Sequence, residues 1–177
     1  HAKAIIHAWY PGALGGLALA NILAGEVNPS AKLPVTIYRG DHDMPDFEDY
    51  NMTGRTYRYF QGEPLYPFGY GLSYTTFAYG DIQLPETAKV GDAVKVIVPV
   101  TNSGKMDGDE VVQLYIKKQG DEEGPIKTLR AFKRVHIPAG ETVNVELELT
   151  PKQLEWWNPE TNSVCNVAGT YDILVGG

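Results

Sequence analysis

VNVELEL, at residues 143–149, alternates apolar and polar side chains at every position. Its valines and leucines share one side of an extended chain, while the asparagine and the two glutamates share the other. In antiparallel sheets one face of such a strand packs into a core and the opposite face meets water. The stretch therefore predicts a half-buried antiparallel strand.

Similar patterns surround this strand throughout residues 77–177. Strand-like stretches follow one another with turns at intervals of roughly 8–12 residues, the spacing typical of a β-sandwich. They are FAYGDIQL, VKVIVPVTN, VVQLYIK, TLRAFKRVHI, SVCNV and TYDILVGG, with the aromatic stretch QLEWWN among them. About 100 residues in about seven strands predict an immunoglobulin-like or fibronectin-type sandwich, so the chain is predicted to be mainly β.

Residues 1–38 show a different pattern, of strand, helix and strand. AIIHAWY at 4–10 is a short apolar run, ALGGLALANILAG at 13–25 has the composition of an apolar helix, and LPVTIY at 33–38 is again extended. Gly25 stands where a left-handed helix cap is expected. Because such a unit normally belongs to a larger parallel sheet, residues 1–38 are predicted to be the remnant of an α/β domain.

Several glycines, prolines and one asparagine are predicted to shape turns. Three glycines after the first apolar run allow a sharp turn and close helix packing, but their spacing differs from the dinucleotide-binding GxGxxG pattern. An Asn-Pro turn leads into an extended segment ending in proline, and two further glycines allow local bends. The residues with this predicted structural role are Gly12, Gly15, Gly16, Asn28, Pro29, Pro34, Gly69 and Gly71.

Residues 39–76 lack a sustained period of either kind but are rich in aromatic side chains. Twelve of the 19 aromatic residues fall between Tyr38 and Tyr79. Because each aromatic side chain buries on the order of 150–250 Å² when packed, such a segment is not an ordinary linker. We expect residues 39–76 to form an ordered, extended strap that packs against a neighbouring part of the protein.

The charge balance opposes two classes of partner. Fifteen basic residues stand against 22 acidic ones, giving a net charge of -7 and a pI near 5.0. This charge disfavours nucleic acid and anionic lipid surfaces. No apolar run reaches the roughly 18 residues of a membrane span. Cys165 is the single cysteine, the histidines lack metal-ligand spacing, and neither a metal site nor a cofactor is expected.

Four motifs occur in order along the chain. They are PGALGG at 11–16, NPSAKLPVT at 28–36, FGYGLSYTTF at 68–77 and GDEVVQLY at 108–115. Together they resemble the C-terminal part of the family 3 glycoside hydrolases, which are β-glucosidase and β-xylosidase-like enzymes, including their fibronectin type III-like domain. The resemblance runs nearly end to end, and residues 52–77 are more similar to the xylosidase branch.

The resemblance implies a parent enzyme that hydrolyses β-linked glucosides or xylosides in oligosaccharides with retention of configuration. Such enzymes use two carboxylates about 5–5.5 Å apart. In the family the nucleophilic aspartate lies in an N-terminal barrel, and the acid/base glutamate precedes the PG-x-x-GG motif. Neither carboxylate can be assigned to this chain, so it is predicted to be a scaffold that is inactive alone. Its partners are the missing barrel and α/β domains, and its compartment is periplasmic or extracellular, with the cytoplasm as the alternative.

A few residues remain candidates for direct contact with a ligand. His7, Trp9 and Tyr10 follow the first predicted strand, and ligands of open α/β sheets bind beyond the carboxyl ends of strands. They are predicted to form one wall of the substrate cleft, or alternatively a strand end covered by the strap. Other candidates are better explained by structural roles: Asp41, Asp43, Asp46, Glu48 and Asp49 in an acidic loop, Arg55 and Arg58 in the strap, and Trp156 and Trp157.

Two other functions remain open at this stage. A free-standing carbohydrate-binding β-module would need an exposed aromatic row on one sandwich face, but VNVELEL places glutamates there. A protein-interaction module is the second alternative. The apolar surface of residues 1–38 also predicts self-association, since strands deprived of their sheet tend to pair with other chains.

Overall fold

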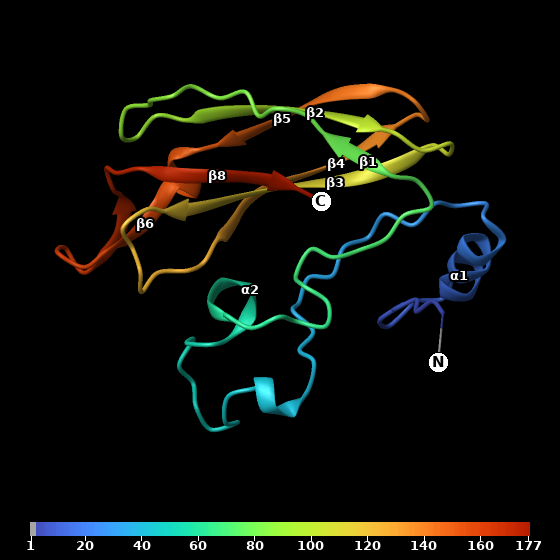
Figure 1. The fold of residues 1–177 in the computed structure, drawn as a ribbon, viewed down its shortest axis with the longest axis horizontal. Coiled ribbons are helices and arrows are strands. Elements are labelled where there is room, and N and C mark those ends of the chain that lie inside the picture. The colour runs from blue at the N-terminus through green and yellow to red at the C-terminus, as the bar shows by residue number, and fades with distance from the viewer. Residues whose placement is uncertain (1–2) are drawn as a thin grey trace.

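The computed structural model describes residues 3–177 and contains a two-sheet β-sandwich with a separate N-terminal part (Figure 1). One sheet has the order β1-β2-β5 and the other the order β4-β3-β8, and all neighbours are antiparallel. A two-stranded ribbon, β6-β7, follows at one end. The bounds are β1 Phe77–Tyr79, β2 Val94–Asn102, β3 Gly108–Lys118, β4 Thr128–Ile137, β5 Thr142–Leu149, β6 Glu155–Asn158, β7 Ser163–Asn166 and β8 Tyr171–Gly176.

The core lies between the two sheets and confirms the predicted alternation. In β5, Val145, Leu147 and Leu149 are buried while the intervening residues are exposed. Val145 lies opposite Val98 of β2, which is also buried. The facing sheet contributes Leu114 and further apolar residues to the same cluster. The predicted mainly β fold of the fibronectin type is therefore confirmed, and burial of these side chains is its main stabilising contribution.

Helix α1, Gly15–Ala24, confirms the helix expected after the first apolar run. It ends at Gly25, which adopts the left-handed conformation with φ of 76° and donates its N–H to the carbonyl of Ile22. None of its residues is buried, although Leu17 and Leu23 are large and apolar. Figure 1 shows this helix outside the sandwich, so its apolar surface remains uncovered.

The two strands predicted beside this helix are not formed. Residues 4–10 have no regular structure, and in 33–38 only Ile37 forms a bridge, with Tyr66 of the strap. The backbone of Leu33 exchanges hydrogen bonds with the strap instead, accepting from Gly69 and donating to Tyr70. A parallel strand needs a hydrogen-bonded neighbour, and the part of the chain that the structure describes offers none to residues 4–10.

Short helical turns interrupt the strap. They are the 3₁₀ turn η1, Asp41–Asp43, and helix α2, Thr56–Tyr59. A further turn, η2 Pro151–Leu154, precedes β6 in the sandwich. None of the helices within residues 3–177 has the length and hydropathy needed to cross a membrane.

Candidate functional site

The strap lies against the outer side of β3 through an aromatic cluster. Tyr57 stacks on Phe68 with ring centroids 4.2 Å apart. The ring of Tyr115 makes T-shaped contacts with both, at centroid distances of 5.9 Å to Tyr57 and 6.4 Å to Phe68. Such aromatic pairs contribute about 0.5–1.5 kcal/mol each beyond the burial of their area. The aromatic strap is thus ordered by packing on the sandwich, and the contact surface between residues 1–76 and the sandwich is called the seam below.

A glycine brings the strap backbone close to β3 at the centre of this seam. Gly69 has φ of 83°, and a Cβ atom there would meet the side-chain amide of Gln113 and the hydroxyl of Tyr115. The Gln113 amide donates to the Gly69 carbonyl at 3.3 Å and accepts from the Tyr115 hydroxyl at 2.6 Å. Burial, with a contribution from nearby Tyr57, raises the pKa of Tyr115 to about 12, so this hydroxyl remains a donor.

A buried ion pair crosses the same seam. Lys32 Nζ lies 3.2 Å from Glu110 Oε1, and their side chains are only 14% and 5% exposed. The Tyr79 hydroxyl donates to the same carboxylate oxygen at 3.2 Å, and Lys32 also donates to the carbonyl of Gly71. Burial and the charge of Glu110 raise the pKa of Tyr79. Gly71 itself packs against the backbone carbonyl of Ala31, where a side chain would have no room.

The side chain of Asn28 makes a further connection, because it joins its own turn to the strap and to the turn before β3. Its side-chain oxygen accepts from the Ser73 hydroxyl and from the backbone N–H of Tyr74, both at 2.8 Å. Its amide nitrogen donates to the carbonyl of Asp107 at 3.0 Å. Asn28 therefore acts across the seam rather than only within its own turn.

The remaining predicted turn residues lie outside the seam. The Gly12 carbonyl accepts from the N–H of Gly15, and a Cβ at Gly15 would collide with Pro11. Gly16 has open space around it. Pro29 and Pro34 lie in the extended segment after α1, and the chain bends at Pro34.

The predicted cleft wall lies near the N-terminus, away from the aromatic cluster of the seam. His7 and Trp9 contact each other edge to face, with ring centroids 4.4 Å apart. Tyr10 is 99% exposed and Trp9 is 53% exposed. Trp9 has φ of 49°, a conformation that is costly for a bulky residue and that it shares with Thr56 and Asn162.

The acidic loop of the strap does not gather its carboxylates into a site. Asp46 and Asp49 accept hydrogen bonds from the backbone N–H groups of Glu48 and Asn51, two residues further on. Backbone and side-chain hydrogen bonds from Asn51 lower the pKa of Asp49. Arg55 donates to the carbonyl of Asn51 and so closes the loop. Residues 3–177 contain no cluster of three potential metal-ligating side chains.

The two tryptophans of β6 point to opposite faces, as expected for neighbours in a strand. Trp156 is buried in the core cluster, and its indole N–H donates to Asp121 Oδ2 at 2.6 Å. Trp157 is half exposed on the other face. Trp156 therefore has a packing role, and Trp157 is the accessible one of the two.

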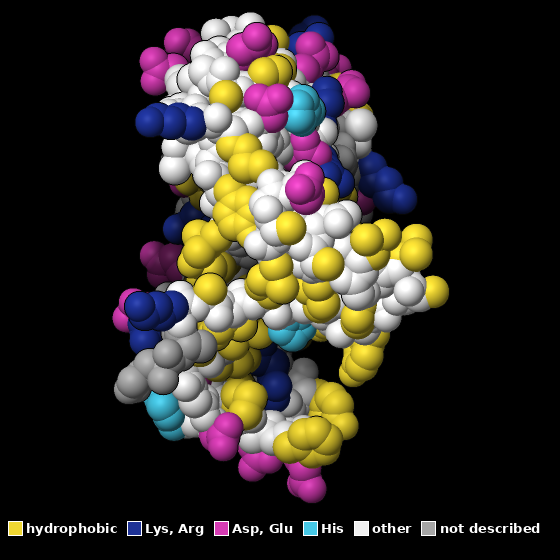
Figure 2. Space-filling model, turned by 90° about the vertical axis from the view of Figure 1, so that its right-hand side faces the viewer, with side chains coloured by type: hydrophobic (Ala, Val, Ile, Leu, Met, Phe, Trp, Pro, Cys, Tyr) yellow, Lys and Arg dark blue, Asp and Glu magenta, His cyan; other side chains and the backbone are white. Residues whose placement is uncertain are grey.

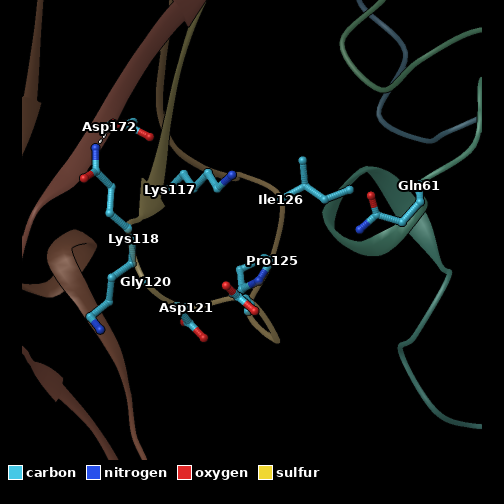
Figure 3. Close-up of a pocket in the computed structure, with 11 residues that line it drawn as sticks. Gln61, Lys117, Lys118, Gly120, Asp121, Pro125, Ile126 and Asp172 are labelled. Atoms are coloured by element: carbon cyan, nitrogen blue, oxygen red, sulfur yellow. Dashed lines mark hydrogen bonds between the residues drawn. The ribbon is translucent and has the colours of Figure 1, made fainter.

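A polar cavity of about 350 Å³ lies where the strap meets the loop between β3 and β4 (Figure 3). Gln61 faces it from the strap, and Lys117 and Asp121 face it from the sandwich. No aromatic side chain lines it, so it lacks the stacking surface typical of a sugar site.

Two family models match this chain, one on each side of residues 75–109. The Glycosyl hydrolase family 3 C-terminal domain matches residues 1–74, and the Fibronectin type III-like domain matches residues 110–177. The chain belongs to the family 3 glycoside hydrolases and corresponds to their C-terminal region. The contacts of Lys32 with Glu110 and of Gly69 with Gln113 therefore join the two matched parts of this family 3 region.

Similar proteins carry glycosidase names. A xylan 1,4-β-xylosidase of Xylanibacter ruminicola is 51% identical over 98% of this chain and 20% of its own length. A periplasmic β-glucosidase of Salmonella typhimurium is 35% identical over 99% of this chain and 25% of its own length. The crystal structure of DesR, a β-glucosidase from Streptomyces venezuelae, superposes with a TM-score of 0.83 at 32% identity over 95% of this chain and 24% of that protein. The chain thus spans a fifth to a quarter of these family 3 relatives.

Proposed function

We propose that this chain is the scaffold at the C-terminal side of a retaining β-glycosidase that acts on β-linked xylosides or glucosides, and that it is inactive alone. The observation that carries the proposal is the alignment itself. Almost the whole chain matches glycosidases of which it covers only 20–25%. The 51% identity with a xylosidase favours a xyloside as substrate.

The geometry of the carboxylates supports the absence of catalysis. A retaining glycosidase needs two carboxyl groups about 5–5.5 Å apart, one of which holds a proton at neutral pH. The hydrogen bonds from Asn51 lower the pKa of Asp49, which is the opposite of what an acid catalyst needs. Glu110 is buried but is neutralised by Lys32. These acids therefore serve local turns and packing.

The first test is an assay of the 177-residue chain with 4-nitrophenyl β-xyloside and β-glucoside. We expect no turnover above buffer. If any turnover is found, alanine variants of the acidic loop show whether it depends on one of the loop carboxylates. The variants are made at Asp41, Asp43, Asp46, Glu48 and Asp49. Turnover that one of these variants abolishes would place a catalytic carboxylate in this chain and overturn the proposal.

The exposed rings near the N-terminus are proposed as one wall of the substrate cleft in the whole enzyme. The proposal rests on the exposure of Trp9 and Tyr10, on the strained backbone of Trp9, and on the contact that holds His7 against it. Aromatic faces with nearby polar groups are typical of ligand sites.

A chimera tests the scaffold and the wall together. This chain replaces the matching segment of the Xylanibacter xylosidase, and we expect the chimera to hydrolyse the aryl xyloside while a truncated enzyme does not. Within the chimera, Trp9→Ala should raise KM about tenfold, which corresponds to about 1.4 kcal/mol of binding. Tyr50→Ala removes an even more exposed ring from the strap loop and should leave KM unchanged. Equal effects of both variants on KM would contradict the proposal that the N-terminal rings line the substrate cleft.

We also propose that the whole protein works in the periplasm or outside the cell, with the cytoplasm as the alternative. The support is the periplasmic relative from Salmonella typhimurium. Fractionation of the source cells, followed by immunodetection with an antibody raised against residues 77–177, distinguishes the compartments.

A further inference from the structure

The sandwich has a second cavity, also of about 350 Å³, between β4 and β5. Each of these strands is an edge of its sheet, because the two strand orders are β1-β2-β5 and β4-β3-β8. The cavity is lined by residues 130–133 of β4, residues 146–148 of β5 and Gln153 of η2. Ligand pockets in proteins measure about 300–1,000 Å³, so this cavity is large enough for a small ligand.

Phe132 adds an aromatic residue to the lining of this cavity. It is 69% exposed, although it belongs to a regular strand. Its partner in β3 is Gln113, which the strap covers through Gly69, whereas Phe132 itself stays largely uncovered. An exposed phenylalanine offers a flat apolar surface, and such a surface beside polar groups is typical of a ligand site.

Two polar side chains of the lining are held in place by hydrogen bonds. The Gln153 amide nitrogen donates to the Arg130 carbonyl at 2.7 Å, and its oxygen accepts from the N–H of Thr150 at 2.8 Å. The Arg130 guanidinium donates to the Glu155 carbonyl at 2.9 Å and lies over the Trp156 ring. Groups fixed in this way lose little freedom when a ligand binds, which favours affinity.

The charges of the lining residues balance. Two cations, Arg130 and Lys133, are matched by two carboxylates, Glu146 and Glu148. Lys95 lies 2.7 Å from Glu146, whereas within residues 3–177 neither Lys133 nor Glu148 takes part in an ion pair. Their ammonium and carboxylate groups therefore supply one donor and one acceptor for a ligand. A lining without net charge does not select an ion, but it suits hydroxyl groups, which both donate and accept.

We propose that this cavity binds one pyranose unit of a neutral β-linked oligosaccharide without hydrolysing it. A pyranose has an apolar face of C–H groups, which fits against Phe132, and hydroxyl groups at its rim, which fit Lys133 and Glu148. The glutamates of VNVELEL, which oppose a continuous aromatic row, thus supply an acceptor beside a single ring. The sandwich would then bind a glycan in addition to its proposed scaffold function.

The test measures saturation transfer by NMR from the 177-residue chain to xylohexaose, with the open-chain alcohol xylitol as the reference. The signals observed are those of the ligand, so self-association of the protein does not obscure them. We expect transfer that saturates with xylohexaose concentration and an affinity that hardly changes up to about 0.5 M sodium chloride, because the ligand is neutral. Transfer that never saturates, that xylitol reproduces, or that salt abolishes overturns the proposal.

Variants of three lining residues locate the binding. Phe132→Leu keeps an apolar side chain but removes the ring and should weaken binding about tenfold, whereas Phe132→Tyr should retain it. Lys133→Met and Glu148→Met each remove one hydrogen-bonding group and should weaken binding about two- to tenfold. All three residues are exposed, so we expect these variants to stay folded, which their urea midpoints check.

Matched controls change residues outside the cavity. Phe47→Leu removes a ring that is 93% exposed on the strap, and Lys105→Met removes an exposed lysine from the turn before β3. Both should leave the affinity for xylohexaose unchanged. An equal loss in Phe132→Leu and Phe47→Leu, or a loss confined to Trp9→Ala, would place the binding elsewhere and overturn the site. Xylose released in the same spectra reports hydrolysis, so a failure of the proposed inactivity is distinguished from a failure to bind.

Discussion

Single buried side chains connect the N-terminal part of this protein to its sandwich. The pair of Lys32 and Glu110 is the least exposed ion pair within residues 3–177. Such a pair adds little net stability over an apolar pair of the same shape, but removing one partner leaves an uncompensated charge in the interior. The positions are therefore sensitive to single substitutions.

We expect Lys32→Met to destabilise the chain by about 3 kcal/mol, because Glu110 would keep only the Tyr79 hydroxyl as a partner. Lys95→Met is the matched control, since its pair with Glu146 is 59% and 51% exposed. An exposed pair contributes less than about 1 kcal/mol. Urea unfolding of both variants measures the difference, and equal losses would contradict a buried charge contact.

The carboxylate of Asp109 makes the stability of the fold depend on pH. Partial burial by itself raises the pKa of Asp109, but hydrogen bonds from His136 and Arg134, together with their charges, outweigh it and hold the pKa below 3.8. The two bonds measure 2.7 and 2.6 Å. Because the folded pKa is depressed, the ionised form stabilises the fold above about pH 4 and this contribution is lost as the pH falls through the folded pKa.

Asp109→Asn should therefore cost roughly 1 kcal/mol at neutral pH and almost nothing near pH 2. Urea midpoints of wild type and variant between pH 7 and pH 2 show the difference directly. Asp92→Asn, at an exposed position, should give a small difference that does not change with pH. A cost of Asp109→Asn that persists at pH 2 would mean that the effect is not electrostatic.

At the scale of elements, the strap and the sandwich share one contact surface but have separate sources of stability. The sandwich closes its own core of valine, leucine and isoleucine side chains between two sheets. The strap packs the rings of Tyr57 and Phe68 against each other and against Tyr115. We therefore propose residues 77–177 as an independent folding unit, residues 39–76 as a dependent strap, and residues 1–38 as the remnant of an α/β domain.

Expressed alone, residues 77–177 should show dispersed amide resonances and one cooperative thermal transition. Residues 39–177 should melt at a higher temperature, because the strap covers Tyr115 and accepts the hydrogen bond of Gln113. Calorimetry of the two segments measures both effects. A segment 77–177 without a cooperative transition would show that the strap belongs to the core.

At the scale of the whole molecule, apolar surface is unevenly distributed. Figure 2 shows hydrophobic side chains gathered below the sandwich, on the side where α1 lies, whereas charged groups are frequent on the sandwich itself. Ile5, Leu14, Leu17 and Leu23 contribute to this exposed apolar surface. Contiguous patches of this kind mark interaction surfaces. We propose that the preceding domains of the intact enzyme cover it.

Without those domains, the 177-residue chain should self-associate through residues 1–38. Light scattering over a concentration series should show a dimer or larger species for the full chain and a monomer for the variant that lacks 1–38. A full chain that remains monomeric at high concentration would mean that its apolar surface is too dispersed to bind a second copy.

The sequence predicted those elements whose signal is local. The alternation in VNVELEL predicted β5, the apolar run with Gly25 predicted α1, and the aromatic density predicted an ordered strap. It was wrong for residues 4–10 and 33–38, which have the composition of strands. Composition reports a propensity for extended structure, but a strand also needs a hydrogen-bonded neighbour, and 33–38 finds only a short pairing with the strap.

Periodicity, turn residues and motif spacing by themselves determined the fold class of this protein and the resemblance to its family, because both depend on patterns within a few residues. Only the tertiary structure decided the seam. The pairing of Lys32 with Glu110, the triple contact of Asn28, and the hydrogen bond from Leu129 to Tyr57 each join segments far apart in the chain. No local pattern marks such contacts, since they depend on how residues 1–76 pack against a sandwich formed by a distant part of the chain.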